Sequence, residues 1–587
     1  MLYVFCTNYI KNSFLLFVSF LFITNLFSQQ VSQGCFNGWD YSPNGVFGNL
    51  RLTCILGRTY YKIEKEDEQN VRVQQINPSG IVTNTTMVVF KKGILTSLTE
   101  ISQWGEKYEY KTFTKVNDNE FIVTDLEHGE NFYFPCKYAR VFYSNDLLTE
   151  ERYYSFKDQL MDNTYGYAIV RYKRYCDSIR FAEKLEMSFY NLKDLPVTSH
   201  SRDCHKTKSE FDIHDNKILE TFYGDNDEAI TSQKFMKSIV KYAYDENNNL
   251  VKTEYYNLNG SLALNIYGFA VYENQYINGY KVKEIGYDSL HNITSGFAIT
   301  TMGAIVKSEY DSSGNRIKIS YFDKNENPVK SSIGVHETVS IFNARNMLIE
   351  KSYFDTSGNP FLNRDGAHKD IYTRDEMGRI STLSSYDSAG DPIKTYIDRV
   401  FMLKYKYDEF SRKTETSFWK DSITSMPNWN GYYKAKTKFN EQGLILEFSY
   451  YDRDDAPFIC LDGASMERYF YNEEGNVGEC QFLHNNNPIT IKNLITSGYS
   501  IMKYGYNENG FINEITFLDE DSKPVNAKIN MREPFNACRI KFIYSSNKVI
   551  EQIFYEIGND TAFKRINCLE NDYISVTGKS IGRKKGN

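Results

Sequence analysis

Aromatic side chains concentrate around one short segment of the chain, where Asp421 and Asn430 stand close to them. Flat rings beside polar groups can stack on a sugar or on a peptide. We therefore predict a ligand-binding site formed by four rings: Trp419, Trp429, Tyr432 and Tyr433. The alternative is that these rings form a small satellite core beneath a long connection.

A thiol flanked by imidazoles is the second group that could do chemistry. His200 and His205 lie on either side of Cys204, and a Cys–His pair can act as a nucleophile. Nothing in the sequence orients them, and the chain has no HExxH, no phosphate-binding loop and no GxGxxG after a strand. We therefore expect no catalytic residues and a protein that is not an enzyme. The alternative is an enzyme whose unrecognised site lies in the N-terminal segment.

Carboxylates gather in two short segments, one containing Asp452, Asp454 and Asp455, the other Asp519-Glu520-Asp521. Alternating carboxylates in a loop can hold calcium. The stronger interpretation is that Asp favours turns, because its side chain bonds the nearby backbone. The chain also lacks a CxxC pair or a Cys/His cluster of zinc spacing. We expect no metal and no cofactor.

Composition restricts the class of protein that these residues belong to. The chain has 587 residues, so it holds several domains or one long repeat array. Aromatic residues make up 16% of it, a bias that suits strands. The formal charge of -7, without a basic stripe, opposes nucleic-acid binding.

The N-terminus predicts export. Lys11 precedes an apolar run of 14 residues, Phe14 to Phe27, which is short for a membrane span and typical of a signal peptide. Ser28 fits the position before the cut, whereas Leu26, two residues earlier, matches the usual small-x-small pattern poorly. We predict a signal peptide over residues 1–28 and a periplasmic, cell-surface or extracellular protein with no later membrane span. An uncleaved anchor is the alternative.

Export changes the interpretation of the cysteines. Ten are present, and removal of Cys6 with the signal leaves nine, an odd number, so at least one is free, intermolecular or modified. Cys35 follows Gly34, as in a lipoprotein site, but Ser32 stands where such a site has a Leu-like residue. A plain disulfide or buried thiol is the alternative to lipidation of Cys35.

Self-similarity is the strongest signal in the sequence. Thirteen related tracts recur about every 33 residues, beginning at Tyr143, Ser178, Phe211, Tyr244, Tyr276, Tyr310, Phe342, Arg374, Tyr407, Phe439, Tyr471, Tyr506 and Tyr544. The first position is aromatic in 11 of the 13 units, and an aromatic residue returns 11 positions later in 12 of them. Pro comes 18 positions after the start at Pro196, Pro328, Pro360, Pro392, Pro457 and Pro524.

The repeat positions predict a fold. Asp or Asn follows the start in nine units, and Gly comes four residues after it at Gly314, Gly378, Gly443, Gly475 and Gly510. Asx and Gly make a tight turn, and period-two alternation on both sides of it is the strand signature. Each unit is therefore a hairpin with a second turn near the Pro. A Gly opens the next strand, as at Gly268, Gly334, Gly366, Gly431 and Gly463. Stacked hairpins bury a continuous face lined by the aromatic residues.

The tracts Tyr244-Asp-Glu-Asn-Asn-Asn-Leu, Tyr310-Asp-Ser-Ser-Gly-Asn-Arg, Asp375-Glu-Met-Gly-Arg and Tyr407-Asp-Glu-Phe-Ser-Arg resemble the YD repeats of the RHS family. The resemblance covers roughly residues 143 to 560. It implies hairpins that wind into large sheets or shells, on exported proteins of which some bind carbohydrate and some enclose a toxin. This chain departs from that pattern in its longer period, in lacking a DPxGL-type closing motif and in having no toxin-like domain after the array.

The sequence thus predicts an all-β protein of tandem antiparallel β-hairpin repeats that form an elongated or spiralling sheet. Residues 29–142 fit the repeat poorly, and we expect them to form a small N-terminal β cap before an array over residues 143–587. Turns are expected at 77–80, 91–93, 117–119 and 128–129. The predicted function is non-catalytic binding or scaffolding in the envelope, with carbohydrate or an envelope protein as partner. An RHS-like shell or toxin-delivery element is the alternative.

Overall fold

The computed structural model describes the chain in segments. These are residues 33–42, 45–51, 59–67, 69–92, 94–102, 107–125, 138–144, 147–154, 158–163, 165–177, 182–214, 216–296, 303–363, 366–394, 399–409, 411–440, 444–460, 463–472, 476–492, 496–507, 512–530, 534–545, 548–558, 562–568, 573–574 and 581–582. The predicted signal peptide (1–28), the 128–129 turn, Gly93, Gly443, Gly475 and Gly510 lie outside these residues, as does the side chain of Cys35.

The strands before the repeat are β1 (Gln33–Ser42), β2 (Gly45–Arg51), β3 (Tyr60–Lys65), β4 (Asn70–Ile76), β5 (Val82–Lys91), β6 (Ile94–Ser102), β7 (Lys107–Asn117) and β8 (Glu120–Asp125). The first half of the array comprises β9 (Tyr138–Ser144), β10 (Leu147–Tyr154), β11 (Ile169–Asp177), β12 (Ala182–Tyr190), β13 (Lys206–Phe211), β14 (Lys217–Tyr223), β15 (Ile239–Tyr244), β16 (Leu250–Tyr256), β17 (Val271–Ile277), β18 (Tyr280–Tyr287), β19 (Ile305–Tyr310), β20 (Arg316–Phe322), β21 (Glu337–Phe342) and β22 (Leu348–Phe354).

The second half comprises β23 (Lys369–Arg374), β24 (Ile380–Tyr386), β25 (Pro392–Ile393), β26 (Met402–Tyr407), β27 (Lys413–Trp419), β28 (Lys434–Phe439), β29 (Ile445–Tyr451), β30 (Met466–Tyr471), β31 (Val477–His484), β32 (Asn487–Pro488), β33 (Thr496–Ser497), β34 (Ile501–Tyr506), β35 (Ile512–Leu518), β36 (Ala527–Ile529), β37 (Phe535–Ala537), β38 (Arg539–Ser545), β39 (Lys548–Tyr555), β40 (Lys564–Asn567), β41 (Tyr573–Ile574) and β42 (Ile581–Gly582). The described residues contain no helix, and therefore none that could span a membrane.

The all-β hairpin prediction is confirmed. Of the described strands, 37 form one antiparallel sheet in which each hairpin pairs with the next along the chain. Each of the 12 repeat starts that the structure describes lies at or next to the end of the first strand of a hairpin. Six residue pairs join β26 to β27 within a hairpin, whereas three join β27 to β28 between hairpins. Neighbouring hairpins therefore diverge towards the turn that contains the start residue.

The tight turns have the predicted chemistry. The Oδ1 atom of Asp311 accepts the backbone N–H groups of Ser313 and Asn315 at 2.9 Å. The residue four positions after the start is in the left-handed region, with φ of 82° at Gly314 and 59° at Asn248. This region suits Gly and tolerates Asn. We call the edge of the sheet formed by these turns the turn edge.

The opposite edge carries the connections from one hairpin to the next, and we call it the connection edge. Phe354 forms an isolated bridge with Pro360, and the next residue, Phe361, donates its N–H to the Tyr353 carbonyl at 3.0 Å. Pro thus occupies the position whose backbone donates no hydrogen bond to the neighbouring strand, as predicted. The five glycines expected to open strands lie instead in a third turn before each strand, with φ between 83° and 101°.

A side-chain hydrogen bond joins successive hairpins where their backbone pairing has ended. The hydroxyl of the start tyrosine donates to a backbone carbonyl at the beginning of the preceding hairpin's second strand. This contact, which we call the tyrosine strap, spans 2.7–3.2 Å in seven units, with the pairs Tyr244–Lys217, Tyr276–Leu250, Tyr310–Lys281, Tyr407–Ile380, Tyr471–Ile445, Tyr506–Val477 and Tyr544–Ile512.

The buried face of the sheet packs against the connections. In the unit of Tyr407, Leu403 and Phe418 are buried with Val400, and Met426 from the connection packs on them. The described residues hold larger buried clusters at the two ends: one spans Ile63 to Leu148, and the other spans Ala464 to Ile566. The small buried clusters of the middle units thus lie between two larger buried clusters, one near each end of the array.

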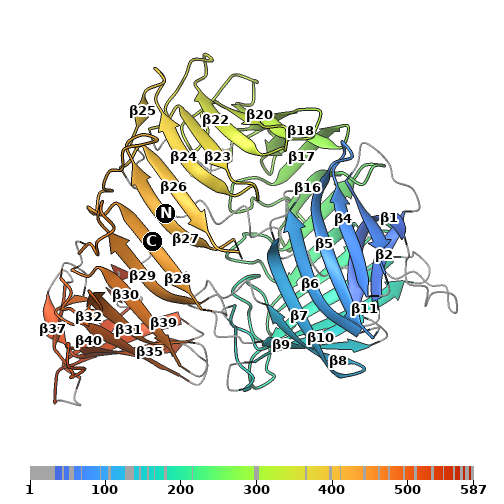
Figure 1. Ribbon diagram of the computed structural model, residues 1–587. Helices are drawn as coiled ribbons and strands as arrows, with labels where there is room; N and C mark the ends of the chain where they lie inside the picture. Colours follow the sequence, from blue (N-terminus) through green and yellow to red (C-terminus); the bar gives the residue numbers. More distant parts are fainter. Residues whose placement is uncertain are drawn as a thin grey trace.

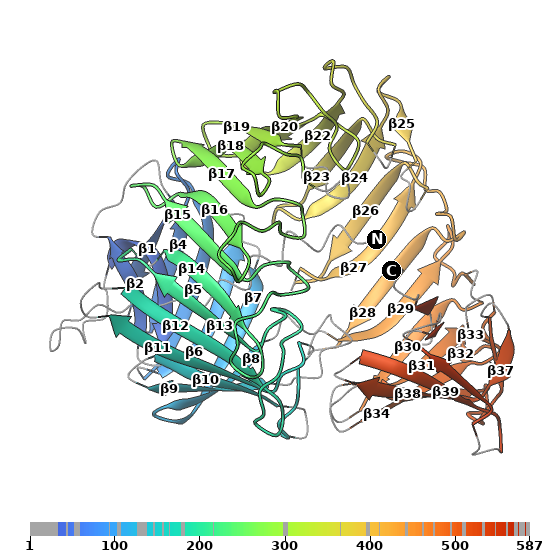
Figure 2. The same ribbon diagram turned by 180° about the vertical axis from the view of Figure 1, so that it is seen from behind.

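The sheet coils, and Figures 1 and 2 show β4–β7 overlying the strands from β10 to β16. The turn after β4 meets hairpins far along the chain: Asn77 Nδ2 donates to the Ser313 carbonyl at 2.9 Å, and the Ser79 N–H donates to the Tyr280 hydroxyl at 3.0 Å. We call this contact the clasp. A Cβ at Gly314 would overlap the Tyr280 hydroxyl, so the clasp also requires Gly there. Strands β2 and β40, the ends of the pairing order, have no described pairing with each other.

Removal of one strap tests its contribution. Tyr407→Phe leaves the ring in place but withdraws the donor from the Ile380 carbonyl, which we expect to cost about 0.5–1.5 kcal/mol locally. Hydrogen exchange of the β24 and β26 amides should then accelerate by about fivefold. The reciprocal variant Phe439→Tyr supplies a hydroxyl where the start residue has none and should slow exchange in β28. Unchanged exchange in both variants would remove the strap from the account of the fold.

Candidate functional site

The four predicted ligand-binding residues belong to one hairpin and its connection. Trp419 is the last residue of β27, Trp429 lies in the third turn, and Tyr432 and Tyr433 precede β28. They do not gather on one surface, because consecutive residues of extended backbone point to opposite faces of a sheet. Each ring therefore has different neighbours.

Tyr432 belongs to the packed face. Its ring lies edge-on to Phe418 with centroids 5.5 Å apart, and 4.7 Å from the ring of Tyr450 in the next hairpin. The adjacent Tyr433 uses its backbone to join the two hairpins: its carbonyl accepts the Phe418 N–H at 3.0 Å, and its N–H donates to Tyr451 at 2.9 Å. Tyr432 thus serves the core that the alternative interpretation anticipated.

Trp419 lies on the opposite face of the sheet, which bears the charged side chains of the strands. The Lys404 Nζ sits 3.6 Å from the centroid of its ring, a cation–π contact, and the indole N–H donates to Ser417 Oγ at 2.9 Å. Its polar group and one face of its ring are thus engaged within the sheet.

The same cation–π pair recurs along this face. It joins a Lys or Arg on the first strand to an aromatic residue at the end of the second, at 3.6–5.5 Å. The pairs are Arg140–Tyr154, Arg171–Tyr190, Lys208–Tyr223, Lys241–Tyr256, Lys307–Phe322, Lys404–Trp419, Lys436–Tyr451 and Lys541–Tyr555. In seven of these units the cation stands three residues before the start, and in five of those the ring stands twelve residues after it. The sequence analysis missed this row, which that spacing could have revealed.

Trp429 is the candidate that faces solvent, with 54% of its surface exposed. It lies in the third turn, which Asn428 closes by accepting the N–H of Gly431 at 3.0 Å. Ile423, in the preceding turn of the same connection, is 86% exposed. The connection edge of this unit therefore presents a flat ring and an aliphatic side chain to solvent.

The Cys204 thiol is fully buried, and burial raises its pKa to about 12. A thiolate is the reactive form, so at neutral pH this side chain is a protonated thiol. Beside it, burial opposes ionisation of Glu220, but Lys217, Arg202 and Lys237 outweigh that effect and lower its pKa to about 2. The His205 ring packs edge-on against Tyr190, with centroids 5.2 Å apart.

The two carboxylate clusters form turns. Asp452 Oδ1 accepts the N–H groups of Asp454 and Ala456 at 2.9 Å, and Asp519 Oδ1 accepts that of Lys523 at 2.9 Å. Asp455 pairs with Lys434 at 2.5 Å. Across the part of the chain that the structure describes, no three His, Cys, Asp or Glu side chains are grouped as metal ligands.

The two tryptophans should differ in their effect on stability. Trp419→Ala removes packing and a cation–π contact from the sheet and should destabilise the protein by about 1–3 kcal/mol. Trp429→Ala removes an exposed ring and should change stability by less than about 0.5 kcal/mol. Thermal unfolding of both variants measures the difference, and equal losses would contradict these placements.

Burial of Cys204 predicts its reactivity. Native protein treated with iodoacetamide at pH 8 should leave Cys204 unmodified when digested and analysed by mass spectrometry, because the thiol is protonated and shielded. The same treatment in denaturant should modify it. Alkylation of Cys204 in the native protein, at the rate of a free thiol in solution, would show that the thiol is accessible.

No protein-family model and no curated protein sequence matches this chain. Among solved structures, the chain is similar to the TcdB2-TccC3-TEV chain, with 10% identity and a TM-score of 0.26 over 90% of this chain and 32% of that one. The TcdB2-TccC3-Cdc42 chain has 10% identity and a TM-score of 0.27 over 87% of this chain and 32% of that one. A porin-like protein from Bacteroides uniformis has 8% identity and a TM-score of 0.10 over 60% of this chain and 91% of that one. This chain thus spans about a third of the length of the TcdB2-TccC3 chains that it matches.

Proposed function

We propose that this protein is an exported, non-catalytic binding or scaffold protein of the cell envelope or extracellular space. In this proposal it recognises carbohydrate or protein through its connection edge. The apolar run from Phe14 to Phe27 supports export. The buried, protonated thiol of Cys204 and the turn-forming roles of Asp452 and Asp519 support a role without catalysis.

One observation carries the proposal: successive hairpins expose apolar side chains on their connections. Six of the seven units from that of Tyr244 to that of Phe439 expose such a side chain. The exception is the unit of Arg374, whose connection includes residues 395–398, which lie outside the described residues. The exposed side chains are Leu258, Tyr267, Leu290, Ile333, Leu362, Ile423, Trp429 and Ile459. Scattered apolar residues on a surface need no explanation, but a row that recurs with the repeat suits a partner.

The geometry of this row indicates the shape of the partner. Neighbouring strands lie about 4.8 Å apart, so successive hairpins present their connections at intervals of about 10 Å. An extended glycan or polypeptide lying along the edge would meet several of these side chains in turn. A ring such as that of Trp429 offers a flat apolar surface on which a sugar or a peptide side chain can stack.

The test is a binding screen of residues 29–587 against a glycan array and fractionated envelope extracts. We expect a saturable partner whose affinity falls by about fivefold or more in Trp429→Ala and in Ile423→Ser. Ile213→Ser is the matched control, because Ile213 is 59% exposed but lies on the turn edge. A partner whose affinity is the same for all three variants binds elsewhere, and hydrolysis without binding would replace this function with an enzymatic one.

A shell or toxin-delivery element is the second candidate function, and the clasp favours it. A sheet whose early turn at Asn77 meets Ser313 and Tyr280 has coiled back on itself, as a wall that encloses contents must. This role requires a hollow particle and a neighbouring effector. Small-angle scattering that fits a filled or open sheet would exclude it.

A further inference from the structure

The face of the sheet that carries the cation–π pairs, which we call the charged face, bears five lysines on two strands. Alternate residues of a strand point to one face, so Lys404 and Lys406 of β26 share it with Lys434, Lys436 and Lys438 of β28. Both strands pair with β27 and therefore lie about 10 Å apart. We call these five lysines the lysine patch. The formal charge of the whole chain is -7, so the patch concentrates charge of the opposite sign.

The glutamates beside the lysine patch are more deeply buried than the lysines. Lys406 pairs with Glu415 at 3.1 Å, and Lys438 with Glu447 at 4.0 Å. The two lysine side chains are 70% and 66% exposed, whereas those of Glu415 and Glu447 are 11% and 22% exposed. Glu447 is also shared with Arg468, at 2.9 Å. A partner that approaches this face therefore meets ammonium groups before carboxylates.

A third carboxylate, that of Asp455 in the turn after β29, is shared by several lysines. It pairs with Lys434 at 2.5 Å and with Lys436 at 3.7 Å. The hydrogen bond from Lys434 is the main cause that lowers the pKa of Asp455, and the charges of Lys436 and Lys406 add to it. Among the described residues, the ion pairs of the lysine patch thus involve three carboxylates for five lysines, and positive charge is in excess.

An exposed apolar ring continues the row of exposed lysines. Lys406 and Lys438 each stand one position before the start of their unit, and Phe470 stands at that position in the next unit. All three pair in register with a glutamate of the second strand, so they lie on one face. Phe470 is 44% exposed. Successive hairpins therefore present two ammonium groups and then a phenyl ring, at intervals of about 10 Å.

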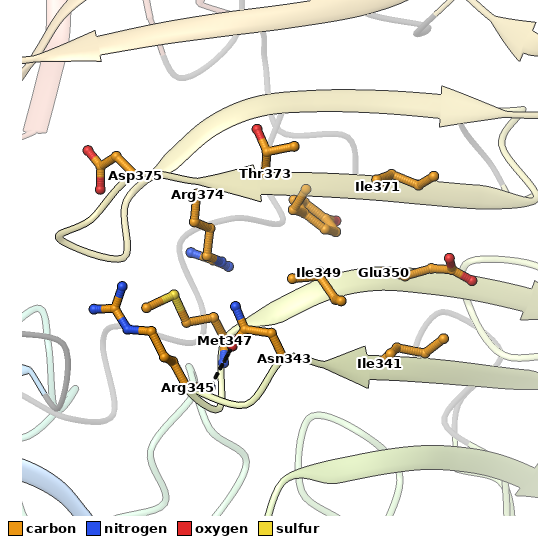
Figure 3. A pocket seen from close by; sticks show the side chains of 11 residues that line it. Ile341, Asn343, Arg345, Met347, Ile349, Glu350, Ile371, Thr373, Arg374 and Asp375 are labelled. Atoms are coloured by element: carbon orange, nitrogen blue, oxygen red, sulfur yellow. Dashed lines mark hydrogen bonds between the residues drawn. The ribbon is translucent and has the colours of Figure 1, made fainter.

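The charge of this row is local. Of the 13 units, only those of Tyr407 and Phe439 have a cation one position before the start. Figure 3 shows the two units before them, in which Ile341 on β21 and Thr373 on β23 hold this position. These two side chains lie with Arg374 around a groove of about 530 Å³, where the backbone pairing of the hairpins has ended.

Two larger rings lie among the lysines. Trp419 at the end of β27 lies against Lys404 at 3.6 Å, and Tyr451 at the end of β29 lies against Lys436 at 4.4 Å. Trp and Tyr are enriched where a membrane meets water, because one part of the ring is apolar and another is polar. The lysine patch therefore combines positive charge with the ring types of that boundary.

We propose that the lysine patch and Phe470 dock this protein on an anionic lipid bilayer. The ammonium groups lie at the lipid phosphates, and the ring of Phe470 enters the boundary between headgroups and acyl chains. Lysine is a flexible point charge, which suits headgroups that move within a bilayer, and clusters of four to eight cations are typical of proteins that bind such surfaces. Phe470 favours a bilayer over a soluble polyanion, because a polyanion offers no apolar layer. The contact does not depend on the connection edge, so this proposal and the proposed function can fail separately.

Sedimentation of residues 29–587 with lipid vesicles tests the contact. Vesicles of phosphatidylglycerol and phosphatidylcholine in about equal parts should bind the protein, and vesicles of phosphatidylcholine alone should bind it more weakly by about tenfold or more. Raising NaCl from about 0.1 M to about 0.5 M should release the protein, because salt screens exposed charges. Both measurements use the protein without substitutions.

Removal of charge from the patch locates the contact. Lys406→Gln should weaken binding to the anionic vesicles by about fivefold, and Lys406→Gln combined with Lys438→Gln by about 25-fold. Lys523→Gln is the matched control. Lys523 is 72% exposed and pairs with Asp521 at 3.3 Å, as Lys406 does with Glu415, but it lies at the connection edge. This variant should bind as the original protein does.

Removal of the apolar ring distinguishes a bilayer from a soluble polyanion. Phe470→Ser should weaken binding to the anionic vesicles by about fivefold, because less apolar surface leaves water. It should leave any binding to dextran sulfate or duplex DNA unchanged. Ile557→Ser is the control, because Ile557 is 50% exposed but lies in the turn after β39.

Thermal unfolding of each variant separates loss of the contact from loss of the fold, and if a variant does not fold, the lipid and salt comparisons decide. Equal sedimentation with the two kinds of vesicle would overturn the proposal, as would full binding by folded Lys406→Gln. Binding of dextran sulfate or DNA through the same lysines, with no effect of Phe470→Ser on vesicles, would replace the bilayer with a soluble polyanion.

Discussion

The hydrogen bond from a tyrosine hydroxyl to the carbonyl of the preceding hairpin is the interaction on which the array depends. Backbone pairing between hairpins covers three residues, so the turn ends of neighbouring hairpins would otherwise separate. The strap spans that separation in seven units, and Arg374 replaces it in an eighth. Because the donor is at the end of a side chain, the hairpins can stay joined while their strands diverge, and this divergence leaves the groove beside Arg374.

The acidic residue after the tyrosine has a separate role. Asp311 fixes its own turn through the N–H groups of Ser313 and Asn315, and its Oδ2 accepts the Asn315 amide at 2.8 Å. That amide also donates to Asn346 in the next turn at 2.9 Å. The tyrosine thus reaches back along the array and the asparagine reaches forward. The resemblance to YD repeats rests on the tyrosine and the aspartate that follows it. Each of these two residues has a physical reason to recur.

The parts of the fold that sequence could predict are those that local chemistry determines. Turns such as Asp311–Asn315 follow from side chains bonding their own backbone, and the strands follow from period-two alternation. The clasp between Asn77 and Ser313 depends on how far the sheet coils, which no local pattern encodes. The residues of the candidate site are separated for a similar reason, because Trp419 and Tyr432 are near in sequence but lie on opposite faces of the sheet. The row of cations beside Trp419 differs, because its fixed spacing from the start residue is already present in the sequence.

The clasp has a consequence for the order in which the protein folds. A hairpin closes within a few residues and can form in microseconds, so the array can assemble unit by unit as the chain emerges. Asn77 must wait for a carbonyl 236 residues later, which makes the clasp a late, non-local contact. Until then β4 and its turn lack the contact that joins them to the later hairpins. The interval between synthesis of β4 and of the Ser313 turn is thus a period in which the N-terminal strands can contact other chains instead.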